Sequence, residues 1–228
     1  MRKSGILLHI ASLPNDYGIG SMGREAYDFV DYLKKSGQSV WQILPLSQTS
    51  YGDSPYQSFS IYAGNPYFIS LDVLAEEGLL KKSEYENIKW CEDPRYIDYA
   101  TMYEQFYKVM KHAYRRFSLQ RNGNVSGEYR AFLDDNKWLH DYALFMALKA
   151  HFGMVSWTEW PEEDIRKHEP EAVEKYRAEL AEEIDFQVFM QCMFFRQWNA
   201  LRDYAHEQGV EFIGDVPIYV ALDSADVW

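Results

Sequence analysis

Two short apolar runs flank one amphipathic stretch in the first 46 residues. The run from Gly5 to Leu13 (GILLHIASL) ends at Pro14, which is typical of a buried β-strand. Apolar residues recur at helical spacing from Ala26 to Leu33 and stop before Gly37, which predicts an amphipathic helix with a glycine cap. A second apolar run, Ser39 to Leu46, predicts another strand. Together these elements predict a β-α-β unit with parallel strands and a right-handed crossover.

The middle of the chain, from Leu71 to about Gly209, has an almost wholly helical pattern. Rings in the stretch Tyr96 to Phe117 have the spacing of helix packing, and the charge run Glu171 to Glu183 is typical of a solvated face. The last helix is the clearest because its apolar residues recur every three or four positions until Gly209 stops it. These residues are Ile184, Val188, Cys192, Phe195, Trp198, Leu201 and Ala205.

A third strand is predicted from Val210 to Val220, with Asp215 at the point where the strand leaves the sheet. Ligands in parallel α/β sheets and barrels sit at the carboxyl ends of the strands, which makes Asp215 a candidate binding residue. An aspartate before Val216 and Pro217 is equally typical of a turn cap. Both interpretations of Asp215 stay open on local grounds.

The segment YGDSPYQSFSIYAGNPY, residues 51–67, follows the second predicted strand. Its two glycines and two prolines argue against regular structure, so the segment is a loop. Disordered loops are poor in aromatic residues, whereas this loop carries five rings. Rings with hydroxyl groups nearby suit a sugar, which has a flat C–H face and many hydrogen-bonding groups. An Ω-type loop packed by its own side chains is the alternative.

Composition narrows the possible functions. The 228 residues are 47% hydrophobic with a formal net charge of −12, which permits a sizeable core and disfavours sequence-independent binding to nucleic acid or anionic membranes. Cys91 and Cys192 lie far apart outside any C-x-x-C motif, which indicates free thiols, no disulfide framework and no metal site. No cofactor is expected. The apolar run from Ile6 lacks a cleavage site and no stretch reaches membrane-spanning length, so we expect a cytoplasmic protein.

Three stretches then carry a family resemblance: GILLHIASLP with YGIGSMG, VWQILPLSQTSYGDSPYQSFSIYAGNPYFISL, and FIGDVPIYVALDSADVW. In this order they resemble the amino-terminal part of the 4-α-glucanotransferases called amylomaltases or disproportionating enzymes, glycoside hydrolase family 77. The resemblance extends over the whole chain, strongly at both ends and weakly in the helical part. It departs at Ile10-Ala11, where many members have Pro-Thr, and at Ser47-Gln48, where many have Gly-Pro. Neither departure touches YGDSPYQS.

The resemblance implies an α/β fold, the (β/α)8 TIM barrel of the α-amylase clan with extra subdomains. A complete barrel needs about 250 residues before insertions, whereas this chain shows three barrel-type strands. We therefore expect a truncated N-terminal part: residues 1–70 with a substrate loop at 47–67, a helical insertion at 71–209, and a third strand and following loop at 210–228. An incomplete barrel would leave a strand edge open to self-association.

The activity implied by the resemblance is transfer of α-1,4-glucan segments between malto-oligosaccharides, in starch, glycogen and maltose metabolism. Such retaining double displacement needs two carboxyl groups about 5 Å apart. In the family these carboxylates lie on later strands, so no residue of this chain is assigned as catalytic, and we expect no transfer by the chain alone. The alternatives are an α-glucan hydrolase of the same clan, or a non-catalytic fragment that binds glucan or serves as a structural partner.

Four residues match family positions that contact or organise the substrate site. Tyr56 resembles the ring that stacks on the sugar at the cleaved bond, and Ser54 a hydrogen-bonding neighbour. Tyr51 resembles a platform for glucan farther from the chemistry. Asp215 corresponds to the first acidic motif of the clan, which orients groups around the catalytic centre without being the nucleophile.

Four further residues have competing interpretations. Asp53 is a substrate-binding candidate or the start of an Asx-turn. Tyr219 and Trp228 belong to the site or pack within the barrel. His9, on an apolar strand, is interpreted as a satisfied core histidine rather than a substrate ligand.

Overall fold

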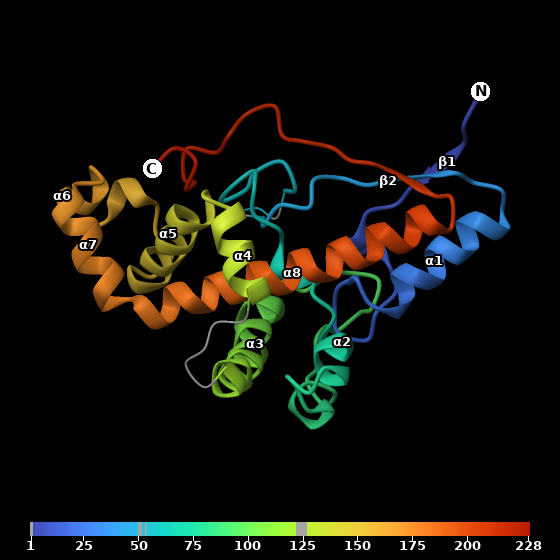
Figure 1. The fold of residues 1–228 in the computed structure, drawn as a ribbon, viewed down its shortest axis with the longest axis horizontal. Helices are drawn as coiled ribbons and strands as arrows, with labels where there is room; N and C mark the ends of the chain where they lie inside the picture. The colour runs from blue at the N-terminus through green and yellow to red at the C-terminus, as the bar shows by residue number, and fades with distance from the viewer. Residues whose placement is uncertain (1, 50–51, 53, 122–126) are drawn as a thin grey trace. The chain divides into compact units, whose positions relative to one another are not determined.

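The computed structural model describes residues 2–49, 52, 54–121 and 127–228 (Figure 1). These residues form two compact units that interleave along the chain. Unit 1 comprises Met1–Leu46, Asn65–Asn124 and Met193–Val216, and unit 2 comprises Ser47–Gly64, Val125–Cys192 and Pro217–Trp228. Two sequence-predicted site residues, Tyr51 and Asp53, lie outside the described residues. In the described part of the chain, no helix is long and apolar enough to cross a membrane.

Unit 1 contains a three-stranded parallel sheet in the order β1-β2-β3. The strands are β1 (Gly5–Leu7), β2 (Val40–Gln42) and β3 (Glu211–Ile213), with Gly5 opposite Val40 and Val40 opposite Glu211. The predicted α/β class and the three parallel strands are therefore confirmed.

The predicted lengths of these strands were wrong. After β1 the chain turns into a 3₁₀ helix, η1 (Ile10–Ser12), in which the Leu13 amide donates to the Ile10 carbonyl at 3.0 Å. Pro45 and Pro217 have no N–H to donate to a ladder, so neither β2 nor β3 can continue as a paired strand through them.

Two helices of the sheet layer end in the same glycine motif. Both α1 (Arg24–Lys35) and α8 (Ala181–Glu207) are followed by a glycine at positive φ, +69° for Gly37 and +80° for Gly209. In each case the next residue donates back to the carbonyl five residues earlier: Gln38 to Leu33 at 2.9 Å and Val210 to Ala205 at 2.8 Å. These bonds define a Schellman motif. The predicted glycine stops are confirmed, and each turns the chain into the following strand.

Aromatic contacts join these helices to the sheet within unit 1. Phe29 of α1 lies edge-on to Trp41 of β2 at 4.8 Å, and Trp198 of α8 contacts Phe212 of β3 at 4.9 Å. Trp41 is fully buried, and its Nε1 donates to the Leu8 carbonyl at 2.7 Å. Burial of one such side chain contributes roughly 2–3 kcal/mol. Strands β2 and β3 are therefore packed against helices from one face of the sheet.

The rest of unit 1 consists of η2 (Pro66–Phe68), α2 (Leu71–Glu76), η3 (Lys82–Glu84) and α3 (Tyr99–Arg121). On α3 the buried side chains recur at helical spacing: Met102, Phe106, Val109, Met110, Ala113 and Tyr114. Phe106 and Tyr114 are packing, as predicted for the aromatic stripe, whereas Tyr103 is 52% exposed and does not fit that prediction.

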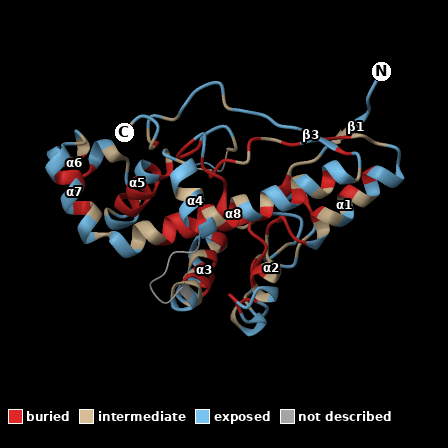
Figure 2. Ribbon diagram, in the orientation of Figure 1, coloured by how far each residue is buried: buried red, intermediate tan, exposed pale blue. Residues whose placement is uncertain are grey.

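Unit 2 consists of α4 (Gly127–Asp135), α5 (Leu139–His151), η4 (Trp157–Glu159), α6 (Glu163–Arg166), α7 (Pro170–Glu179) and the first turns of α8. Most of α5 is buried (Figure 2). The C-terminal segment ends beside α5 and α6 (Figure 1), where the Trp228 ring lies 5.8 Å from Phe145 and its Nε1 donates to the Ile165 carbonyl. The interpretation of Trp228 as packing within the barrel was wrong in its partners, because the ring packs on helical residues of unit 2. That of Tyr219 was wrong, because this side chain is 84% exposed.

Candidate functional site

The tyrosine-rich loop lies in unit 2 and is a distorted hairpin rather than a free coil. Its two arms meet in isolated antiparallel bridges, Ser47 with Gly64 and Thr49 with Ser58. Between them the Phe59 amide donates to the Gln48 carbonyl at 3.4 Å. These backbone bonds join the described parts of the two arms to each other.

The rings of the loop divide into buried and exposed sets. Phe59 is 7% exposed and lies 6.4 Å from Phe145 of α5, so this ring anchors the loop in the core of unit 2. Tyr56 is 47% exposed and Tyr62 is 57% exposed. Tyr62 stacks on Trp138 at 6.1 Å with an interplanar angle of 24°. The loop therefore both packs and presents rings, as its composition predicted.

Ser54 shapes the turn that carries Tyr56. Its Oγ accepts from the Tyr56 amide at 3.3 Å, and its carbonyl accepts from the Gln57 amide at 3.1 Å. A serine hydroxyl that accepts from the backbone two residues on forms an ST-turn and can still donate its own hydrogen. Ser54 thus holds the Tyr56 backbone in position, and its role toward a sugar stays a prediction.

A buried amide and phenol network clamps the base of the loop. Gln191 of α8 pairs with both backbone groups of Gly64: its Oε1 accepts from the Gly64 amide at 2.8 Å, and its Nε2 donates to the Gly64 carbonyl at 2.9 Å. Tyr142 of α5 donates to Gln48 Oε1 at 2.6 Å and accepts from Gln191 Nε2 at 3.4 Å. Burial raises the pKa of the Tyr142 hydroxyl, which remains a neutral donor.

Sequence reasoning missed this clamp. Gln191 lies three residues after Val188 and four before Phe195, so it interrupts the apolar stripe of α8. A glutamine on a buried helical face is the signal that could have found it, because a buried amide needs hydrogen-bond partners.

Asp215 belongs to unit 1 and follows the carboxyl end of β3. Its side chain is exposed, and its Oδ1 accepts from the Val216 amide at 2.8 Å. This contact fits the turn-capping interpretation, while a role around a catalytic centre is untested. Because Asp215 and Tyr56 belong to different units, the shared groove expected from the sequence stays a prediction.

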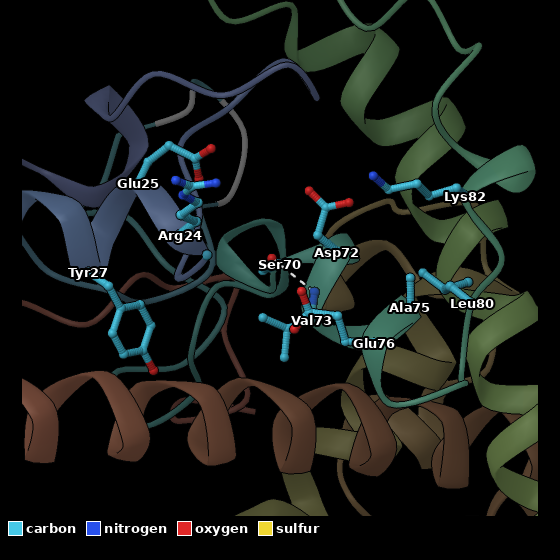
Figure 3. Close-up of a pocket in the computed structure, with 11 residues that line it drawn as sticks. Arg24, Glu25, Tyr27, Ser70, Asp72, Val73, Ala75, Glu76, Leu80 and Lys82 are labelled. Carbon is cyan, nitrogen blue, oxygen red and sulfur yellow. Dashed lines mark hydrogen bonds between the residues drawn. The ribbon is translucent and has the colours of Figure 1, made fainter.

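A groove of about 910 Å³ lies within unit 1, between the first turn of α1 and α2 (Figure 3). Arg24 and Lys82 lie on either side of Asp72 in this view, and Glu25 and Glu76 add further charge. Sequence reasoning singled out none of these residues. In the described part of the chain, no cluster of histidine, cysteine and carboxylate side chains has the arrangement of a metal site.

Asp72 is held by two phenols. The Tyr17 hydroxyl donates to its two oxygens at 3.0 and 3.2 Å, and the Tyr85 hydroxyl donates to Oδ1 at 2.7 Å. Burial, and next the hydrogen bond to Asp72, raises the pKa of both tyrosines. Both phenols stay protonated, so the cluster is a fixed hydrogen-bonded support for the start of α2.

Comparison with known proteins identifies the family of this chain. The sequence model of the 4-alpha-glucanotransferase family matches residues 8–228. A 4-alpha-glucanotransferase of Clostridium butyricum is 50% identical over 222 residues, which is 97% of this chain and 45% of that protein. One from Streptococcus pneumoniae TIGR4 is 47% identical over 228 residues, again 45% of its length. The chain therefore spans about half the length of these relatives.

Solved structures agree with this assignment. The amylomaltase of Streptococcus agalactiae in complex with acarbose superposes with a TM-score of 0.97 at 46% identity, covering 100% of this chain and 46% of that one. Corynebacterium glutamicum amylomaltase has a TM-score of 0.67 at 17% identity, which shows the fold alone. From the family match and these identities, the chain belongs to the 4-alpha-glucanotransferase family, glycoside hydrolase family 77, whose members are transferases.

Proposed function

We propose that this chain forms part of the glucan-binding surface of a 4-α-glucanotransferase, which moves α-1,4-glucan segments between malto-oligosaccharides. The observation that carries the proposal is the presentation of Tyr56: its ring is 47% exposed on a turn that Ser54 holds, in a loop anchored by Phe59. A half-exposed ring on a fixed turn offers the C–H face of a sugar a surface that is already ordered before binding.

Each predicted site residue has a role in this proposal. Tyr56 stacks on the sugar at the cleaved bond, Ser54 donates a hydrogen bond to it, and Asp215 orients groups around the reaction centre. Tyr51 is a platform for glucan farther from the cleaved bond, and Asp53 is a further substrate-binding residue. Retaining transfer also needs two carboxyl groups about 5 Å apart, which the family places on later strands. A stacked acceptor sugar outcompetes water for the glycosyl-enzyme because it is held at high effective concentration.

The fold proposed for the complete enzyme is a (β/α)8 barrel, with residues 71–209 as a helical insertion and the loop at 47–67 at the carboxyl end of the second strand. Three adjacent parallel strands with helices on one face support this proposal, because such a barrel is built from parallel strands in sequence order. Cys91 and Cys192 form no disulfide among the described residues, which supports a cytoplasmic location, where thiols stay reduced.

A chimera tests the proposed function. In it, this chain replaces the matched part of the Clostridium butyricum relative, with which it is 50% identical. Incubated with maltotriose, the chimera should release glucose and form maltopentaose and longer oligomers, whereas the 228-residue chain alone should form none. Glucose and maltose without longer products would indicate hydrolysis instead. A folded chimera with neither outcome would contradict the proposal.

A further inference from the structure

Asp226, in the C-terminal segment of unit 2, holds the far arm of the tyrosine loop. One carboxylate oxygen accepts from Ser60 Oγ at 2.8 Å, and the other accepts from the Ile61 amide at 2.7 Å. Beside this pair, the Ala225 amide donates to the Phe59 carbonyl at 2.8 Å. Three hydrogen bonds from two adjacent residues thus hold three consecutive loop residues, across 165 or more positions of sequence.

The segment that carries Asp226 is itself fixed. Ser224 is fully buried, its Oγ donates to the Ala221 carbonyl at 2.6 Å, and its carbonyl accepts from the Trp228 amide at 3.1 Å. Trp228 packs on Trp160 at 5.4 Å. The carboxylate therefore projects from a closed turn between two anchored residues.

Asp223 provides a second anchor on the core. Its Oδ2 accepts at 2.6 Å from Lys149 Nζ, whose side chain is fully buried, and its Oδ1 accepts from the Trp157 amide at 3.2 Å. Lys149 Nζ also donates to the Met154 and Val155 carbonyls at 3.1 and 2.7 Å. A buried ammonium with three oxygen partners resists rearrangement, because separation would leave its charge uncompensated.

We propose that Asp226 is a positioning residue for glucan binding: its carboxylate holds the Ser60–Ile61 arm, so that the turn bearing Ser54 and Tyr56 is ordered before the sugar arrives. The inference rests on the proposed function. Ser60 is 1% exposed while Ile61, Tyr56 and Tyr62 are exposed, so Asp226 joins the buried Ser60 hydroxyl to the exposed part of the loop that presents the rings. Without them, Phe59 keeps its ring contact and its backbone bonds, whereas the Ser60 hydroxyl and the Ile61 amide lose this acceptor, and binding must then order that part of the arm.

The experiment compares Asp226→Ala, Asp226→Asn and Ser60→Ala in the chimera described above, with Asp135→Ala as a control that removes an exposed carboxylate elsewhere in unit 2. The substrate and probe is maltoheptaose. Loss of two hydrogen bonds to a charged group should raise its KM about tenfold, with kcat within about twofold. Asp226→Asn, which keeps one acceptor oxygen, should lie between Asp226→Ala and wild type. Asp135→Ala should match wild type.

Hydrogen exchange at the Ile61 amide supplies the second readout. It should quicken in Asp226→Ala and less in Asp226→Asn, and a double-mutant cycle of Ser60→Ala with Asp226→Ala should show coupling. A wild-type KM together with fast Ile61 exchange would overturn the positioning role and leave the proposed function standing. If Asp226→Ala does not fold, a wild-type KM in both Asp226→Asn and Ser60→Ala would also overturn the positioning role. No transfer by the wild-type chimera would instead overturn the proposed function.

Discussion

At the scale of single residues, His9 shows how burial sets protonation. It follows β1 and lies edge-on to Phe68 at 5.2 Å, and its buried Nδ1 has no hydrogen-bond partner among the described residues. The interpretation of His9 as a satisfied core histidine was therefore wrong at this atom. Burial lowers the pKa of its imidazole from 6.5 to about 4, because an imidazolium here would lose hydration without gaining a partner.

This pKa predicts a pH dependence of stability. Between pH 6.5 and pH 4 the unfolded chain binds a proton that the folded chain excludes, so the free energy of unfolding should fall as the pH drops through this range. The loss is about 3 kcal/mol at most. His9→Gln, which does not titrate here, should remove that part of the slope in urea unfolding at pH 7 and pH 4.5. His140→Gln, at an exposed position, should keep it.

Tyr56 yields a prediction about substrate contact. If its ring stacks on a sugar, Tyr56→Ala should lose about 2 kcal/mol of transition-state stabilisation, measured from kcat/KM for maltotriose in the chimera. Tyr56→Phe should lose less, because the ring remains. Steady-state kinetics on the two variants separates ring from hydroxyl. Equal losses in both would assign the contact to the hydroxyl, and wild-type kinetics in both would remove Tyr56 from the site.

At the scale of elements, two glutamine side chains of α8 hydrogen-bond to backbone groups as a neighbouring strand would. Gln191 pairs with the amide and carbonyl of Gly64 in unit 2, and Gln197 pairs with those of Ser70 in unit 1 at 2.8 and 3.3 Å. All four backbone groups are buried, and irregular backbone has no ladder to satisfy it. One helix thus satisfies two irregular segments of backbone in place of secondary structure.

Removing one of these side-chain amides should lower the free energy of unfolding. Gln191→Met keeps the side-chain volume but leaves the Gly64 amide and carbonyl without their partner, which predicts a loss of about 2–4 kcal/mol in the free energy of unfolding. Gln187→Met is the matched control, because Gln187 is also buried on α8 but its side chain donates to Glu183 on the same helix rather than to irregular backbone. Urea unfolding of both variants provides the measurement. Similar losses would contradict a special role for the Gly64 pair.

The same elements show why prediction from sequence succeeded in part. Gly37 and Gly209 marked helix ends correctly, because positive φ at a helix C-terminus is a local property of glycine. Strand lengths failed because the apolar runs extend past the residues that pair, through Pro45 and Pro217, which have no N–H for a ladder. Tyr56 was found by a family motif. Gln191 and Asp226 were missed because their partners lie 127 and 165 or more residues away.

At the scale of the whole molecule, the outer edges of the sheet favour self-association and the net charge opposes it. In the described residues β1 and β3 are the outer strands, so each has one edge that pairs with no other described strand. On these outer strands Leu7 is 55% exposed and Ile213 is 49% exposed, and Val216, beyond the end of β3, is 76% exposed. Unpaired edges with apolar side chains favour association between copies. The net charge of −12 opposes it, because both copies carry the same sign.

Salt should therefore decide whether the chain self-associates. The Debye screening length falls from about 10 Å at 0.1 M salt to about 3 Å at 1 M. Charge repulsion between copies therefore weakens at high salt, while apolar contact at the edges persists. Sedimentation velocity at 0.05 and 0.5 M sodium chloride should show monomer at low salt and a growing dimer fraction at high salt. Ile213→Lys, which places a charge on the β3 edge, should keep the chain monomeric in both. Leu119→Lys is the matched control, since Leu119 is 74% exposed on α3, outside the sheet. A dimer that persists in Ile213→Lys would place the contact elsewhere, and a wild-type monomer at high salt would show that the sheet edges do not drive association.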